Sequence, residues 1–451
     1  MLKPMTLDFN FRPSRHGVRD MSPLSMTDLE SELLSHYIAH TAQTIPFDAA
    51  GLSALQIGIP GLALQSRPVM CSLLALAAAC KCVDLLNENL DHPDMRKTVS
   101  ELLEFAETRH QESVRLIQDV IHDAGQSSYV LANAAMMVCF APASHCINIR
   151  LSQITPLTMP RTPSDGLRYV LLTRAPYLAF EGLTFRQDSA QSEISDHESN
   201  VEQYPEDTPA GGEAHASANT MANAYNEQCH ALFPVLRATY GAALSELRAR
   251  SSSALEFGQL CGGPGGFCEC DRCSCASAMD LLSAIFRNVF ADSNQAGTAR
   301  SKVLPDSNAG DLAPWLRRFV QNAVSASGVR PLRYTILNFV QRAPTGFIEL
   351  LRRELGDESP SSPTDLVLAV FAPPRCEDIV VTMALNIFAH WLVLLLLLDE
   401  VWWIGPIGKF ELDRLTKRMV EVHSSELGVD GQPTDWWPGR MDAMYKMLHT
   451  G

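Results

Sequence analysis

Residues Ile379–Leu398 read IVVTMALNIFAHWLVLLLLL and carry no formal charge over 20 positions. A helix of this length that is apolar on all sides lies either in a membrane or in a large protein core. Asn386 and His390 lie within the run, acidic residues flank it at 377–378 and 399–400, and no basic residue is adjacent. We therefore expect a buried central helix and no membrane span.

Helical periodicity continues on both sides of this run. Near the start, Met26–Thr41 repeats apolar residues at three- and four-residue spacing, with Thr27 and Glu30 placed for a capping box. Gly51–Pro68 predicts a loop, because it is rich in glycine and proline, and Val69–Leu86 predicts an apolar, alanine-rich helix. No alternating run of β-branched residues is long enough for a sheet. The predicted fold class is all-α: a multi-helical array around the central apolar helix, with a disordered acidic insertion.

The chain divides into four predicted parts. Residues 1–26 form a flexible tail and 27–186 a first helical half. Residues 187–219 form a disordered linker, because acidic, serine, proline and glycine residues replace apolar ones there. Residues 220–450 form the second helical half of the same domain, interrupted by a cysteine- and glycine-rich insertion at 258–276.

Composition limits the classes of partner. With 46% hydrophobic residues the chain can bury a large core, whereas a net charge of −15 opposes binding to nucleic-acid phosphates. The N-terminus lacks the apolar region of a secretory signal, so we expect a location in the nucleus or cytoplasm and reduced thiols for the 12 cysteines.

Four closely spaced cysteines are candidate metal ligands: Cys268, Cys270, Cys273 and Cys275. The Cys-x2-Cys pair in their middle could give two thiolates to a tetrahedral zinc ion. A structural zinc site needs four ligands, however, and the Cys-x-Cys spacing on either side points neighbouring thiols apart. We therefore favour a flexible or redox-sensitive insertion over an ordered metal site, and we expect no cofactor.

His36 and His40 lie four residues apart on one predicted helix, the spacing with which two imidazoles share a metal ion. The residues between them include no glutamate in a His-Glu-x-x-His arrangement, and a third ligand is missing. We therefore interpret them as histidines of the core or of the polar face.

Three stretches resemble the fungal-specific transcription factor domain, in the branch that includes the sterol-uptake regulators. LLSHYIAHTAQTI (Leu33–Ile45) is similar to the opening helix of that family, and PVMCSLLALAAACKC (Pro68–Cys82) to its second element. LLLLLDEVWWIGPIGKFELDRL (Leu394–Leu415) is the most specific stretch and is similar to the family's ending, where an apolar helix leads into aspartate, paired tryptophans and Ile-Gly. The WWP at Trp436–Pro438 also fits, whereas Gln187–Lys302 matches no part of the family.

The resemblance implies a helical regulatory fold, but DNA binding does not follow from it. Full-length members carry a zinc cluster of six cysteines, spaced as two Cys-x2-Cys-x6-Cys repeats, which places a helix in the major groove. No such spacing occurs in this chain. We therefore expect no direct contact with nucleic acid. Binding to a partner transcription factor stays an open alternative.

Asn386 and His390 face the same side of the central helix and need polar partners if they are buried. One interpretation is an internal polar network that fixes the helix register, which we favour from the residues alone because buried polar groups are normally satisfied by protein. The other is the lining of a cavity. The resemblance favours the cavity, because sterol regulators of this type accommodate a lipid inside the helical domain. Trp391, Trp402 and Trp403 would supply apolar walls for a small apolar ligand.

Two functions from different classes are compatible with these patterns. The first is a transcription-factor-like regulatory protein of a fungal pathway in secondary or sterol and lipid metabolism, which acts through ligand or partner binding. The second is a biosynthetic enzyme on the same scaffold, which would cyclise or isomerise an apolar intermediate held in an internal cavity. No Ser-His-Asp arrangement, phosphate loop or nucleotide fingerprint favours the enzyme.

Overall fold

The computed structural model describes residues 26–46, 48–88, 93–120, 123–154, 167, 169–174, 230–256, 270–291, 312–324, 331–355, 376–424 and 436–449. The predicted tail up to residue 25, the linker 187–219 and the predicted insertion up to residue 269 lie outside these residues.

Every regular element in the described part of the chain is a helix, so the all-α prediction is confirmed. The first half contains α1 (Asp28–His36), η1 (Tyr37–Thr41), α2 (Ala42–Thr44), α3 (Ala49–Ser53), η2 (Ala54–Gly58), α4 (Ile59–Ala63), α5 (Arg67–Glu88), α6 (Pro93–Gln118), η3 (Ala124–Gln126) and α7 (Ser127–Ile154). The second half contains α9 (Phe233–Glu256), α10 (Asp271–Phe290), α11 (Pro314–Val324), α12 (Leu332–Arg342), α13 (Thr345–Leu355), α15 (Cys376–Leu395), η5 (Leu396–Leu398), α16 (Ile407–Ser424) and α17 (Trp437–His449).

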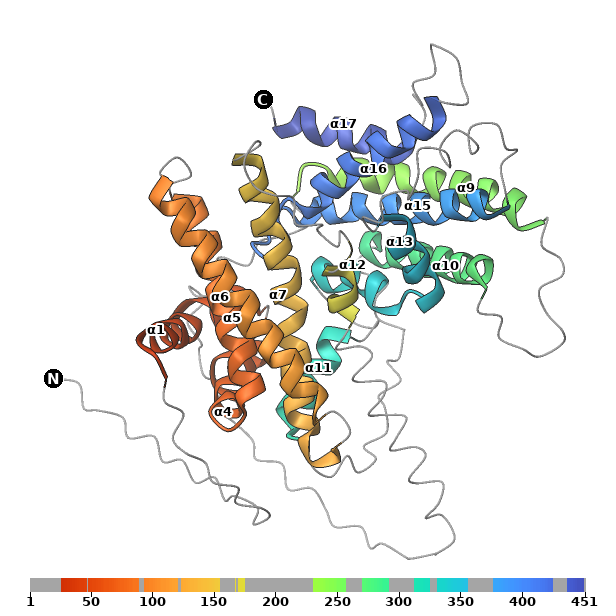
Figure 1. Ribbon diagram of the computed structural model, residues 1–451. Helices are drawn as coiled ribbons and strands as arrows, with labels where there is room; N and C mark the ends of the chain where they lie inside the picture. The colour runs from red at the N-terminus through yellow and green to blue at the C-terminus, as the bar shows by residue number, and fades with distance from the viewer. Residues whose placement is uncertain are drawn as a thin grey trace, which may run out of the picture.

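The helices form two groups that meet at α7 (Figure 1). In the first group the long helices α5, α6 and α7 pack along one another, and α1 and α4 pack against α5. In the second group α15 is surrounded by α9, α10, α12, α13, α16 and α17. Because α7 also contacts α11 and α16, one continuous apolar core runs through both groups.

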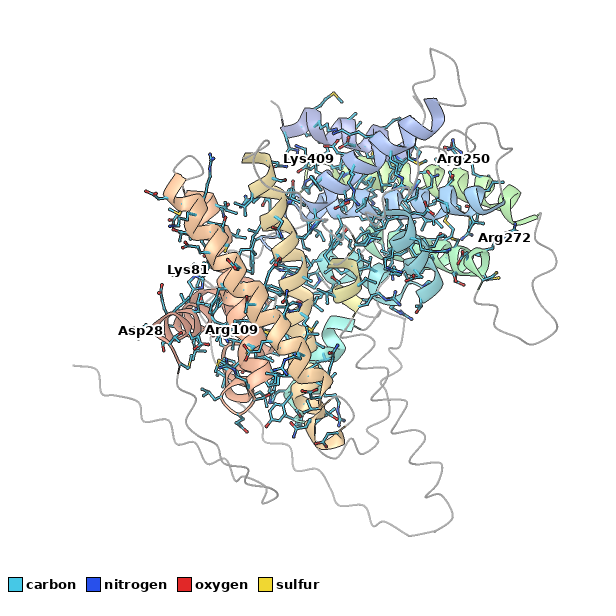
Figure 2. All side chains as sticks on the ribbon, in the orientation of Figure 1. Asp28, Lys81, Arg109, Arg250, Arg272 and Lys409 are labelled. Atoms are coloured by element: carbon cyan, nitrogen blue, oxygen red, sulfur yellow. The ribbon has the colours of Figure 1, made fainter. Side chains whose placement is uncertain are left out.

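The central apolar helix that the sequence predicts is α15 with η5. From Ile387 to Leu398 no side chain is more than 4% exposed. α16 crosses the end of this helix closely at Gly408, where a Cβ atom would lie 2.9 Å from the Cβ of Leu395. Side chains fill the space between the helices, and charged residues such as Asp28 and Arg250 lie on the outside (Figure 2).

The start of the first helix agrees with its prediction, whereas the expected loop does not. Thr27 and Glu30 form the capping box at the start of α1. The predicted loop at Gly51–Pro68 is wrong, because most of it is helical in α3, η2 and α4. Asp48 caps α3 by accepting the backbone N–H of Gly51. The helical run then continues through the π-helical turn η2 into α4, whose second residue is a proline.

The prediction that no segment can span a membrane is also wrong. Three helices are long and apolar enough to cross a membrane: Arg67–Glu88, Ser127–Gln153 and Ile379–Leu398. The sequence argument from flanking charges applies only to the last of these helices. In the structure, 83%, 83% and 78% of the most apolar window of each helix is buried inside the protein. A helix that is apolar on all sides meets the length criterion whether protein or lipid surrounds it.

Candidate functional site

Asn386 and His390, predicted to line a pocket, are held by other protein groups. The side-chain amide of Asn386 donates to the carbonyl of Thr382 at 2.8 Å and accepts Nε1–H of Trp436 at 2.7 Å. Nδ1–H of His390 donates to the carbonyl of Asn386 at 2.8 Å, and the ring stacks on Trp437. Burial lowers the pKa of His390 to about 4, so its imidazole is neutral. Together the two side chains fasten the start of α17 to α15.

The three tryptophans predicted as pocket walls lie in different surroundings. Trp391 is fully buried and donates Nε1–H to the carbonyl of Ile336 at 2.9 Å. Trp402 is partly buried and donates to Oγ1 of Thr44 at 2.9 Å, which links two parts of the chain 358 residues apart. Trp403 is 1% exposed, and its Nε1 has no hydrogen-bond partner among the described residues.

The cavity beside Trp391 is small. It has a volume of about 10 Å³ and lies between Pro142, Tyr169, Val340 and Ile407. None of the other four predicted pocket residues lines it. Because this volume holds about one water molecule, the cavity is too small for a lipid-sized ligand.

The described cysteines of the predicted insertion belong to a helix. Cys270 precedes the first residue of α10, and Cys273 and Cys275 lie in its first two turns, so the helix begins inside the predicted insertion. Cys275 is fully buried, and burial raises the pKa of its thiol to about 12. Cys268 lies outside the described residues.

Two other sets of three metal-type donors converge within the described part of the chain, each with its donor atoms within 4.8 Å of one another. We call His36, His40 and Asp84 the N-terminal cluster. We call His230, Asp399 and His449 the C-terminal cluster. Neither set contains a cysteine.

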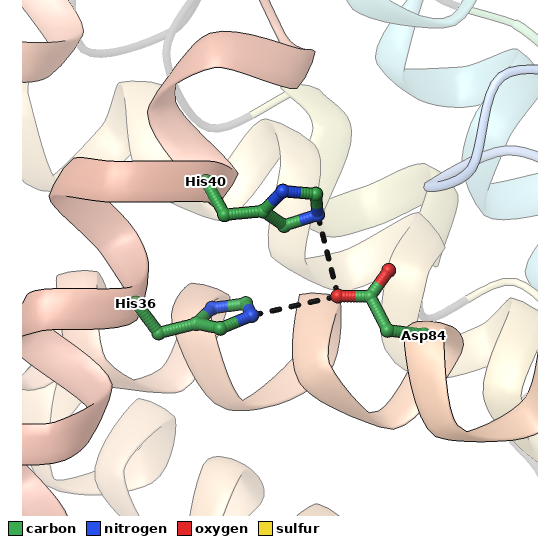
Figure 3. Close-up of side chains that lie close together, drawn as sticks. All are labelled: His36, His40 and Asp84. Atoms are coloured by element: carbon green, nitrogen blue, oxygen red, sulfur yellow. Dashed lines mark ion pairs between the residues drawn. The ribbon is translucent and has the colours of Figure 1, made fainter. Parts of the chain in front are cut away.

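The N-terminal cluster joins the end of α1 and η1 to α5 (Figure 3). Nε2 of His36 lies 3.4 Å from Oδ2 of Asp84, and Nε2 of His40 lies 3.3 Å from the same oxygen. The His36 side chain is 21% exposed, that of Asp84 36% and that of His40 49%. The three donor groups therefore surround a point that is open to solvent on the His40 side.

Buried contacts on both sides position α1 and η1 over α5. Glu30 of α1 is 3% exposed and pairs with Arg109 of α6 at 3.5 Å. Tyr37, the first residue of the π-helical turn η1, is fully buried, and its hydroxyl contacts the sulfur of Met136 on α7 at 3.6 Å. Lys81 of α5 forms an ion pair with Glu32 of α1. His36 thus ends α1 and His40 lies in η1, and these contacts hold both elements over α5.

The surroundings of His36 permit a tautomer with a nitrogen lone pair that faces Asp84. Nδ1 of His36 lies 3.2 Å from Oγ1 of the buried Thr41, a hydroxyl that can accept the Nδ1 hydrogen. In that tautomer Nε2, the nitrogen that faces Asp84, carries the lone pair. Proton assignment at the far nitrogen of a histidine decides which nitrogen can bind a metal ion.

The C-terminal cluster lies deeper and brings together three parts of the second half. Asp399 follows η5, His230 precedes α9, and His449 ends α17. Oδ2 of Asp399 lies 3.2 Å from Nε2 of His449 and 3.5 Å from Nε2 of His230, and it accepts the hydroxyl of Tyr445 at 2.7 Å. The side chains of His230 and Asp399 are only 5% and 15% exposed.

The tautomer of His230 excludes a metal ion at the C-terminal cluster. Nδ1 of His230 accepts the backbone N–H of Leu232 at 3.1 Å. A neutral imidazole that accepts at Nδ1 carries its hydrogen on Nε2, so this nitrogen donates to Asp399 and has no lone pair for a metal. The C-terminal cluster is therefore a hydrogen-bonded and ionic cluster around one carboxylate.

The carboxylate of Asp399 is stabilised in its charged form. Burial by itself would raise its pKa, but the hydrogen bonds from His230 and Tyr445 hold the pKa below its usual value of 3.8. Oδ1 of Asp399 is buried and has no hydrogen-bond partner among the residues that the structure describes.

The same cluster borders an open cleft. Asp399, Tyr445 and His449 line this cleft of about 300 Å³ together with Arg150 and Glu400. It thus presents a carboxylate, a phenol, an imidazole and a guanidinium to solvent.

Sequence reasoning identified only part of either cluster. The His36 and His40 spacing was visible, but Asp84 lies 44 positions beyond His40 on another helix. In the sequence Asp399 is visible only as an acidic residue that flanks the apolar run, and nothing in its neighbourhood indicates His230 or His449. Comparisons of the chain with models of protein families, with curated proteins and with solved structures find no match.

Proposed function

We propose that the protein is a regulatory protein of a fungal pathway that acts through ligand or partner binding. The observation that carries the proposal is that the three stretches resembling the fungal-specific transcription factor domain pack as one unit, although they are far apart in sequence. The first, in α1 and η1, packs on the second, in α5, and Trp402 of the third is hydrogen-bonded to Thr44 of the first.

Two features of the whole chain support a role without direct DNA contact. The net charge of −15 disfavours phosphate binding, and the zinc-cluster spacing is missing from the 451 residues. A regulator of this kind would influence expression by binding another regulator or by responding to a bound molecule.

Deletion of the gene, followed by complementation, tests the proposal. We expect transcripts of the neighbouring pathway genes to fall on deletion and to return when the wild-type gene is restored. Unchanged transcripts together with accumulation of one pathway intermediate would refute regulation and identify an enzyme.

The cleft at the C-terminal cluster favours the second candidate function. An enzyme that isomerises or cyclises an intermediate needs groups that move protons, and Tyr445 donates to Asp399 at 2.7 Å on the wall of this cleft. The reaction would take place in the open cleft, because the cavity beside Trp391 is too small for a substrate.

A point variant separates the two functions in the same strain. Tyr445→Phe removes the cleft hydroxyl and preserves the ring. If the protein is an enzyme, the variant should accumulate the intermediate with unchanged transcripts. If it is a regulator that does not use this cleft, Tyr445→Phe should leave both transcripts and metabolites at the wild-type level.

A further inference from the structure

We propose that His36, His40 and Asp84 bind one divalent transition-metal ion of the zinc class, which fastens α1 and η1 to α5. The proposal uses only the N-terminal cluster and does not depend on the regulatory role. It assigns a metal site where the sequence showed two histidines without a third ligand.

The spacing of the donor atoms fits a tetrahedral ion. Zinc binds imidazole nitrogen and carboxylate oxygen at about 2.0–2.2 Å, so two ligand atoms of a tetrahedral site lie about 3.3–3.5 Å apart. The distances from Asp84 Oδ2 to Nε2 of His36 and of His40 are 3.4 and 3.3 Å. All three donor atoms lie within 4.8 Å of one another, so the three side chains can approach one ion together.

The donor types and the exposure point to the same class of ion. The two imidazole nitrogens suit zinc and its first-row neighbours better than calcium or magnesium, which prefer oxygen ligands, and zinc also accepts a carboxylate. Three protein ligands leave a fourth position, and the half-exposed His40 places it at the solvent side. Water or a side chain of a partner can complete the coordination there.

A hydrogen-bond partner for the second ring nitrogen of His36 is also present. Histidines that bind metal usually donate their second N–H to an oxygen, which fixes the ring. Thr41 Oγ1, 3.2 Å from Nδ1 of His36, can supply this oxygen. The alternative is a pair of His–Asp ion pairs with no metal, for which the amount of zinc bound is the decisive measurement.

Zinc binding is tested on the full-length chain, stripped with a chelator and titrated with Zn²⁺ in a calorimeter. We expect one tight site in the wild type. His40→Gln and Asp84→Asn should each weaken it more than 100-fold, because loss of a ligand costs more than the 10- to 100-fold loss caused by changing its supporting residues. Both side chains are partly exposed, and circular dichroism confirms that the helices remain.

Two control variants separate this site from other donors. His449→Gln removes a histidine of the C-terminal cluster, and Cys270→Ser combined with Cys273→Ser removes the Cys-x2-Cys pair. Both should bind zinc as tightly as the wild type. Loss of the tight site in the cysteine variant, with retention in His40→Gln, would overturn the proposal and assign the ion to thiolates.

Cobalt(II) reports the ligand type directly. In a site with two histidines and one aspartate, Co²⁺ should give visible absorption of a four- or five-coordinate ion without the near-ultraviolet bands of thiolate-to-cobalt charge transfer. The visible bands should disappear in Asp84→Asn. Thiolate bands in the wild type, or a wild-type chain that binds no zinc in the titration, would contradict the assignment.

Discussion

The two clusters of this protein contain the same residue types at nearly the same distances, yet they differ in what they can bind. In both, two Nε2 atoms lie 3.2–3.5 Å from one aspartate oxygen. In the N-terminal cluster the far nitrogen of His36 faces a hydroxyl that can accept its hydrogen. In the C-terminal cluster the far nitrogen of His230 accepts a backbone N–H.

This difference shows that a metal site is not defined by the positions of its donor atoms alone. A backbone amide can only donate, so it forces the hydrogen of a neutral His230 onto the nitrogen that faces Asp399. The hydroxyl of Thr41 imposes no such restriction on His36. Burial differs as well, since the side chain of Asp399 is 15% exposed and that of Asp84 is 36% exposed. We therefore expect the first cluster to respond to metal and the second to contribute to stability.

The largest effect on stability is expected from Asp399→Asn. The substitution keeps the shape but removes the charge that three partners share, and hydrogen bonds to charged groups contribute about 1.5–3 kcal/mol each. We expect the free energy of unfolding, measured by guanidinium titration, to fall by about 1.5–3 kcal/mol. The neighbouring exposed Glu400 is the control, and Glu400→Gln should change this free energy by less than about 0.5 kcal/mol. Equal effects of the two substitutions would show that the C-terminal cluster adds no stability.

The next effect is a change in zinc affinity when Thr41, which contacts Nδ1 of His36, is replaced. Thr41→Val removes the hydroxyl and retains the shape, so the tautomer that presents Nε2 loses its support. We expect zinc affinity to fall about 10- to 100-fold in calorimetry. Thr41→Ser keeps the hydroxyl and should bind within about threefold of the wild type. Wild-type affinity in Thr41→Val would show that this hydroxyl does not orient His36.

A smaller effect on stability is expected when the pH is lowered. The pKa of Asp399 is lowered in the folded protein, so its charged form contributes stability above the unfolded pKa of about 3.9, and this contribution is lost as pH falls through the folded pKa. We expect the stability difference between wild type and Asp399→Asn to be constant from pH 7 to about 5 and to shrink below about pH 4. A difference that grows in acid would contradict the sign of this shift.

The smallest effect is expected from Asp84→Asn in the absence of metal. The side chain is 36% exposed, and exposed ion pairs contribute about 0–1 kcal/mol. The metal-free variant should therefore unfold within about 1 kcal/mol of the wild type, whereas added Zn²⁺ should stabilise only the wild type. A large loss of stability without metal would place Asp84 among the structural carboxylates, like Asp399.

The sequence by itself determined the helices and the centre of the core. Apolar periodicity and the capping residues Thr27 and Glu30 are local signals. The run at Ile379–Leu398 carries no charge on any face of its helix, which predicts burial on all sides. These features predicted an all-helical protein and its central helix. They misassigned Gly51–Pro68, because a capping aspartate permits helix where composition favours a loop. The length and apolar composition of Arg67–Glu88 and Ser127–Gln153 also suffice to predict two further helices that could span a membrane.

Only the tertiary structure decided which polar side chains meet. Asp84 reaches the two histidines because buried contacts of Glu30 and Tyr37 fix α1 and η1 over α5, and no local pattern encodes that packing. The predicted pocket residues were placed likewise by packing: Trp391 lies against a cavity of about 10 Å³, and Trp402 is bound to Thr44. Periodicity in a sequence shows which face of a helix is buried, whereas the partner across the interface depends on how separate helices pack together.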